Sequence, residues 1–493
     1  MKKTISLKVN VVLNVIRVGL GTLFPLITFP YVSRVLGPVN LGQVSFAKSV
    51  INYFALFAAL GIPTYGVLAC SKVRDDKEKL KRTVCELLYI NLFLMIVTYV
   101  IFFSILFLVP KFWQLRKLLL INSISIMMTS IGIDWLYSAL EDFKYITIRA
   151  TVFKFVSVVL IFSFVKQSDD YIVYAFILTF SEIGSNILNL IHARQYVKFY
   201  PIGELNCKRH IKPIVSLFTA SIAATISANT DTVMLGFLKG DYEVGIYNFS
   251  VKIKSMLSTI MTAGLAVFIP RFSYYMRSNQ ITLYRTQIRR IFLLTLTIAF
   301  ALNAFVVAFC EPIIMILGGS EYADAKIPVI ILTSCICVLA CTWTLGVAVL
   351  QPIGREMQYA KGMLLGCIVN VGLNTILIPI WGVVGSAVAT LIGESVIAIA
   401  FHLYTKDFLD NILHRIGLFK IFIVSFSVGV FSYSIVEVTK ELIQLSDLFQ
   451  IIIGGIVFLS LFTFLICAVH KEIRTLLQKQ LQESLNCLKV KRK

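Results

Sequence analysis

The chain has 493 residues, of which 58% are hydrophobic and only 15% are charged. This composition excludes an ordinary soluble globular protein and indicates an all-α polytopic membrane protein. The net charge of +20 does not require a nucleic-acid partner, because basic segments beside membrane helices bind anionic lipid head groups.

Apolar runs of about 20 residues can cross the hydrocarbon core as helices, since each residue adds about 1.5 Å. The sequence contains about fourteen such runs, and an even number places both termini on the same side of the membrane. The predicted helices are 9–32, 43–69, 83–108, 117–140, 147–165, 171–193, 213–237, 244–269, 289–310, 326–350, 360–379, 382–404, 417–437 and 447–469.

The distribution of positive charge predicts the orientation. The segment MKKTISLKVNVVLNVIRVG (1–19) leads into a full-length span without a small-residue cleavage site, so we expect an uncleaved first helix. Placing the N-terminus in the cytoplasm assigns most of the 46 Lys and Arg to cytoplasmic segments, as the positive-inside rule requires. We therefore expect both termini to be cytoplasmic.

The sequence lacks the usual marks of catalysis. Walker A, HExxH, GxSxG and dinucleotide-turn patterns are absent from it, and the ten cysteines have no metal-type spacing. The predicted outer loops are too short to hold a catalytic domain. We therefore expect no enzyme, no metal and no cofactor, and many helices with charges inside the bundle favour a transporter.

An internal repeat predicts the domain organisation. The segment LGQVSFAKS (41–49) aligns with VGIYNFSVK (244–252), which places Gly42 on Gly245, and VVGSAVAT (383–390) is a weaker echo. The repeat implies two six-helix lobes with parallel topology. The expected parts are an N-terminal lobe (1–193), a cytoplasmic linker (194–212), a C-terminal lobe (213–404), two further helices (405–469) and a basic cytoplasmic tail (470–493).

Several segments carry a family resemblance. FPYVSRVLGPVNLGQVSFAKSV (29–50), FALFAALGIPTYGV (54–67), LGGSEYADAKIPVIIL (317–332) and 354–395 resemble the polysaccharide-export branch of the multidrug/oligosaccharidyl-lipid/polysaccharide exporter superfamily, the O-antigen flippases of the Wzx type. The resemblance implies a MATE-like bundle with a central cavity that opens alternately to either side. It also implies a bacterial inner membrane as the location.

The substrate that this resemblance implies is an undecaprenyl-pyrophosphate-linked oligosaccharide repeat unit, moved from the cytoplasmic to the outer leaflet for O-antigen or capsule synthesis. Its implied partners are membrane lipids, a polysaccharide polymerase and chain-length machinery. Related lipid II flippases have cationic cavities, whereas multidrug exporters of the superfamily use acidic residues. The sign of the buried charge therefore distinguishes the two functions.

Three predicted helices carry a cation on a polar stripe. A charged side chain in the middle of a membrane-spanning helix costs at least a few kcal/mol in lipid, so each cation is expected to face water or a partner residue. The stripes are Asn10, Asn14 and Arg17; Ser45, Lys48 and Asn52; and Asn248, Lys252, Ser255 and Thr259. We predict that Arg17, Lys48 and Lys252 attract the pyrophosphate, and a planar guanidinium suits phosphate best.

An alternative is that the interior charges pair with one another. Asp231 lies at a depth similar to that of Lys252 and Lys254, so either lysine is a candidate partner, and all three are kept as candidate substrate-binding residues. Lys254 points away from Lys252 around the helix and ranks below it. Asp134 and Lys154 are interpreted as a structural pair.

Two deeper carboxylates, Glu182 and Glu394, are candidates for binding a coupling proton or sodium ion. Three other functions stay open at this stage. A multidrug or cation antiporter of the same fold is disfavoured by the interior cations, and a membrane polymerase or glycosyltransferase by the short outer loops. A scaffold that transports nothing would leave the polar stripes without a role.

Overall fold

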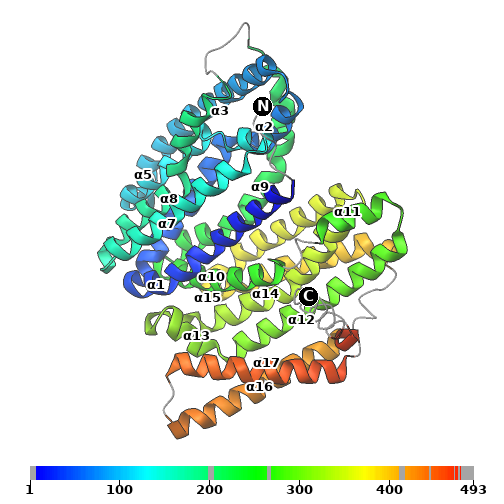
Figure 1. Ribbon diagram of the computed structural model, residues 1–493. Coiled ribbons are helices and arrows are strands. Elements are labelled where there is room, and N and C mark those ends of the chain that lie inside the picture. Colours follow the sequence, from blue (N-terminus) through cyan, green and yellow to red (C-terminus); the bar gives the residue numbers. More distant parts are fainter. Residues whose placement is uncertain are drawn as a thin grey trace, which may run out of the picture. The chain divides into compact units, whose positions relative to one another are not determined.

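The structure is a computed structural model that describes residues 7–197, 205–263, 268–409, 417–443, 446–470, 472–475 and 478. Within these ranges the regular structure is helical, with no β-strand (Figure 1). The helices up to residue 238 are α1 (Leu7–Ala59), α2 (Ile62–Lys72), α3 (Lys77–Leu108), α4 (Pro110–Gln114), α5 (Arg116–Ile131), α6 (Asp134–Ala139), α7 (Phe143–Phe164), α8 (Tyr171–Ala193) and α9 (Lys208–Leu238).

The remaining helices follow in the same order along the chain. They are α10 (Asp241–Ala263), α11 (Ile269–Arg277), α12 (Ile281–Ala308), α13 (Cys310–Leu317), α14 (Lys326–Leu345), α15 (Glu356–Leu409), α16 (Leu418–Ile443) and α17 (Asp447–Val469). Short 3-10 turns at Ser168–Asp170 and Ser320–Ala325 precede α8 and α14, and a π-helical turn, Gly346–Leu350, follows α14.

Two long helices are each divided by one glycine. Gly37 in α1 has φ 69° and ψ 173°, and Gly382 in α15 has φ 55° and ψ −129°. A side chain is disfavoured at positive φ, so glycine can interrupt the helix there without strain. The break that the sequence predicts between the helices 9–32 and 43–69 is confirmed.

The number of spans agrees with the prediction. Ten helices among the described residues are long and apolar enough to cross a membrane. The divisions of α1 and α15 add two segments, and the more polar α9 and α10 complete fourteen. The chain is therefore a multi-pass membrane protein.

The chain forms two compact units, each with its own packing. The first unit runs to Asn248 and includes Asn374–Val383, and the second comprises Phe249–Leu373 and the chain from Val384 onward. A core around the fully buried Leu136 and Tyr137 holds the first unit, and Phe292 and Leu350 lie in that of the second. The lobe boundaries drawn from the sequence stay a prediction.

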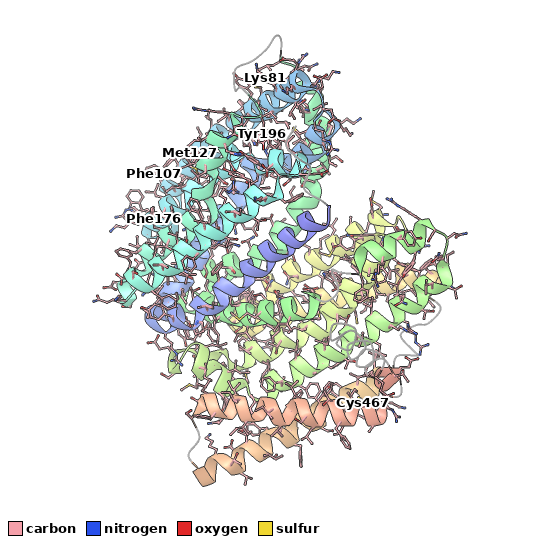
Figure 2. All side chains as sticks on the ribbon, viewed as in Figure 1. Lys81, Phe107, Met127, Phe176, Tyr196 and Cys467 are labelled. Atoms are coloured by element: carbon pink, nitrogen blue, oxygen red, sulfur yellow. The ribbon has the colours of Figure 1, made fainter. Side chains whose placement is uncertain are left out.

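The outer surface of the first unit is apolar where helices would face lipid. Along α3, exposed side chains recur at helical spacing, at Phe93, Ile96, Val100, Phe103 and Phe107. Figure 2 shows Phe107 and Phe176 at the outer edge of this unit, and both side chains are more than half exposed. Such a face would be unfavourable in water and is stable against hydrocarbon.

The beginnings of the two copies of the repeat lie against each other within the first unit. A Cβ atom on Gly42 would lie 1.8 Å from the carbonyl oxygen of Asp241, and one on Gly245 would lie 1.9 Å from that of Pro38. These contacts are reciprocal, because Gly42 aligns with Gly245 and Pro38 with Asp241 in one register. Only glycine permits such a close backbone approach.

Candidate functional site

The structure brings together two residues that the sequence identified for different roles. Lys48 and Glu182 form an ion pair between Nζ and Oε1. Lys48 lies midway along the second segment of α1, between Gly37 and Ala59, and Glu182 lies midway along α8. Their side chains are 36% and 54% exposed. Because exposed charges at this depth are costly in lipid, we infer that the pair faces water.

The polar stripe of α1 continues beyond Lys48 to a contact with α9. Asn52 donates from Nδ2 to Oδ1 of Asn229 at 3.0 Å. The Tyr53 hydroxyl lies 2.7 Å from Oγ1 of Thr230. The face predicted from Ser45, Lys48 and Asn52 therefore carries a charge at its centre and a neutral hydrogen-bonded contact one turn further along.

Arg17, the other cation predicted on the first helix, lies within α1 by its backbone, and its side chain lies outside the described residues. Its role in phosphate binding stays a prediction.

Asp231 is held by two neutral donors that the sequence did not identify. The carboxylate is 6% exposed and accepts hydrogen bonds from the Tyr247 hydroxyl of α10 and from Nδ2 of Asn374 in α15, the latter at 2.5 Å. These three residues belong to the first unit. The part of Asp231 in substrate binding, and its pairing with Lys252 or Lys254, stay predictions.

The remaining candidates belong to the second unit. Lys252 and Lys254 are half-buried on α10, where their carbonyl oxygens accept hydrogen bonds from Ser255 and Ser258. Glu394 is half-buried on α15, beyond the turn at Gly382. That Lys252 and Lys254 contact substrate, and that Glu394 binds an ion, stay predictions.

Asp134 takes part in a structural cluster. Its Oδ1 accepts from Nη2 of Arg149 at 2.8 Å and from Nδ2 of Asn189 at 2.5 Å. The sequence predicted Lys154, five residues further along α7, as the partner, and this prediction is wrong. Arg149 is 5% exposed, so the pair joins a buried guanidinium to a carboxylate that is 56% exposed.

A second, denser group of charges was missed by the sequence analysis. We define the Glu86 cluster as Glu86 of α3 with Arg82, Asn206, Arg209 and His210. The buried carboxylate accepts from the Asn206 backbone N–H at 2.8 Å, from Arg209 at 2.9 and 2.5 Å, from His210 at 2.7 Å and from Arg82 at 3.1 Å. The cluster fixes the start of α9 to α3.

The described residues show no group of three or more His, Cys, Asp or Glu side chains placed to hold a metal ion. The arrangement at Lys48 and Glu182 instead offers an ammonium and a carboxylate midway along their helical segments. Such a pair can bind charged groups by hydrogen bonding and ion pairing.

The fold and these charges define a multi-pass membrane protein of the transporter type. The family model described as "Polysaccharide biosynthesis protein" matches residues 7–276, more than half of the chain. The chain belongs to this family.

Curated relatives cover most of the chain. It is 21% identical over 406 residues to the "Putative O-antigen transporter" of Escherichia coli (strain K12), which spans 82% of this chain and 97% of the relative. A protein of the same name from Shigella dysenteriae is 23% identical over 404 residues, covering 80% and 98% of the two chains. None of these names describes an enzyme, as the sequence predicts.

Solved structures show the same fold. A lipid II flippase, MurJ, in an inward closed conformation superposes with a TM-score of 0.70 at 13% identity, over 93% of this chain and 99% of that one. An inward-facing multidrug MATE transporter of the MOP superfamily gives a TM-score of 0.61 at 17% identity, over 84% and 97%. The predicted MATE-like all-α fold is confirmed.

Proposed function

We propose that this protein is a flippase that moves an undecaprenyl-pyrophosphate-linked oligosaccharide repeat unit from the cytoplasmic to the outer leaflet by alternating access. Family membership, curated relatives named as O-antigen transporters and the fold shared with a lipid II flippase support the proposal. The product would be a surface polysaccharide such as O-antigen or capsule.

The observation that carries the proposal is the partly exposed ammonium of Lys48, midway along a helical segment that is long enough to span the membrane. The charged pyrophosphate is the part of a lipid-linked sugar that is hardest to move through hydrocarbon. A lysine presents three donors to phosphate oxygens, and charge-assisted hydrogen bonds of this kind contribute about 1.5 to 3 kcal/mol each. In this proposal Arg17, Lys252 and Lys254 supply further positive charge, and transport forms no covalent bond.

The proposal includes a location and partners. The protein works in a bacterial inner membrane with both termini in the cytoplasm, as its distribution of Lys and Arg favours. A polymerase that joins repeat units must consume the product, and chain-length machinery acts after it. Glu182 and Glu394 are the proposed sites for a coupling proton or sodium ion, since each is a carboxylate within a predicted membrane-spanning helix.

One observation favours a second function. Glu182 is more exposed than Lys48, and an exposed carboxylate would attract cationic drugs, as in an antiporter of the same fold. The two functions need opposite charges at the site, so one experiment separates them.

The test uses the full-length protein in liposomes. A fluorescent polyprenyl-pyrophosphate sugar and a cationic dye are supplied as alternative substrates, and their movement across the bilayer is measured. We expect movement of the anionic lipid, reduced about tenfold in Lys48→Ala, and none of the dye. Movement of the dye alone, abolished in Glu182→Gln, would establish the antiporter instead.

A further inference from the structure

The Lys48–Glu182 pair differs from the Glu86 cluster in how few contacts hold it. Neither residue has another hydrogen bond among the described side chains, so two ammonium protons and one carboxylate oxygen are left for other partners. In the Glu86 cluster, by contrast, four residues bond one buried carboxylate.

The exposure of the pair makes it exchangeable. An ion pair between half-exposed side chains is weak, because each charge retains much of its hydration. A pyrophosphate carries more negative charge than a carboxylate and has several acceptor oxygens, so it can compete for the same ammonium. Glu182, once released, is exposed enough to be solvated by water.

We propose that Glu182 acts as an internal substitute for the substrate phosphate. It occupies Lys48 when the transporter is empty, and the anionic headgroup displaces it on binding. This keeps Lys48 paired with an anion in both states, so the empty transporter does not hold an unpaired ammonium within the membrane. The inference rests on the proposed function, since it assigns a competitor to the same site.

The competition predicts how Glu182 affects affinity. Removing the carboxylate leaves Lys48 available without prior breakage of the pair. Because exposed pairs contribute little, Glu182→Gln should bind the headgroup about two- to fivefold tighter than the unaltered protein. Lys48→Gln should bind it about tenfold more weakly, and the effect of Glu182→Gln should disappear in that background.

The experiment measures binding of farnesyl pyrophosphate, a short polyprenyl pyrophosphate, to the purified full-length protein by calorimetry. The proteins compared are the unaltered chain, E182Q, K48Q and the double variant. Glu141→Gln is the matched control, because Glu141 is also 54% exposed and forms a single ion pair, with Arg74. Glu182→Asp provides a second variant that keeps the charge and shortens its reach, and it should lie between E182Q and the unaltered protein.

Three results would overturn the inference. If E182Q binds no more tightly than the unaltered protein while K48Q binds more weakly, Lys48 holds the headgroup and Glu182 does not compete. If E182Q tightens binding equally with and without Lys48, the effect is general repulsion and not exchange. If the unaltered protein binds no farnesyl pyrophosphate, the proposed function itself fails together with the inference.

Discussion

The Lys48–Glu182 pair and the Glu86 cluster lie in the same compact unit and are made of the same kinds of charge. The carboxylate of Glu86 is fully buried and bonded by four neighbours, whereas that of Glu182 is 54% exposed and, among the described side chains, bonded by Lys48 alone. A buried charge whose hydrogen-bonding positions are occupied fixes helices to each other. An exposed charge with unoccupied hydrogen-bonding positions is available to a ligand. Burial and the number of hydrogen-bond partners, more than charge alone, distinguish a structural residue from a binding residue.

The largest effect on stability is expected from disturbing the packing of α1, the helix that carries Lys48. In Gly42→Ala the new Cβ would lie 1.8 Å from the backbone oxygen of Asp241, which cannot rotate away. We expect a loss of about 3 kcal/mol in stability, at the upper end for overpacking, together with loss of transport. Thermal unfolding in detergent measures the first and surface polysaccharide the second.

The control for this change is Gly372→Ala in α15, where a Cβ would meet no atom within 4 Å. It should leave stability and transport unchanged. Equal losses of stability and transport in Gly42→Ala and Gly372→Ala would contradict the role of the close contact at Gly42.

Breaking the Glu86 cluster is expected to have the next largest effect. Glu86→Gln removes the charge that four donors share. Loss of one partner of a buried pair costs about 3 to 5 kcal/mol, and we expect about 2 to 3 because Arg82 and Arg209 are 41% and 45% exposed and can be hydrated. Thermal unfolding checks the value, with Glu141→Gln as the exposed counterpart, and similar losses in both variants would argue against the comparison.

The same cluster predicts a pH dependence. Burial lowers the pKa of His210, which precedes the predicted span 213–237, while Glu86 acts in the opposite direction and Arg209 lowers it further. Below the ordinary pKa of about 6.5 the unfolded chain takes up a proton that the folded chain binds less readily. The stability of the folded protein should therefore fall as the pH is lowered from 7.5 to 5.5.

The measurement is the thermal unfolding temperature at both pH values for the unaltered protein and for His210→Gln. The variant should lose less stability on acidification. A greater loss in the variant would mean that the folded protein holds a charged imidazole.

The smallest effect on stability is expected at the exposed pair. Lys48→Gln and Glu182→Gln should each change stability by less than about 1 kcal/mol, since hydration replaces most of the lost attraction. Unfolding temperatures close to that of the unaltered protein are expected. A loss as large as that of Glu86→Gln would show that the pair is structural.

Much of the fold could be predicted because its signals are local. Long apolar runs identify spans, and Gly37 followed by Pro38 identifies the turn within α1. The pairs are different, because their partners lie far apart in the chain. Lys48 and Glu182 were each identifiable as an interior charge, but the crossing of α1 and α8 that joins them is set by packing over many residues.

Glu86 was missed for a related reason. It lies near the start of a span, where a carboxylate resembles an ordinary surface residue, and its partners Arg209 and His210 follow after the end of α8. The hydrogen bond from Asn374 to Asp231 likewise joins helices that no local pattern connects. Local sequence identifies which charges are unusual, and only the packing shows which of them are already satisfied.

The most direct test of the account compares Lys48→Ala with Glu86→Gln in cells lacking their own flippase. Surface polysaccharide is measured and divided by the amount of folded protein in the membrane. We predict a fall of about tenfold or more for Lys48→Ala, as expected from loss of a charge-assisted contact, and a change of less than about twofold for Glu86→Gln. If Lys48→Ala left the amount of surface polysaccharide per folded molecule unaltered, Lys48 would not be a substrate-binding residue.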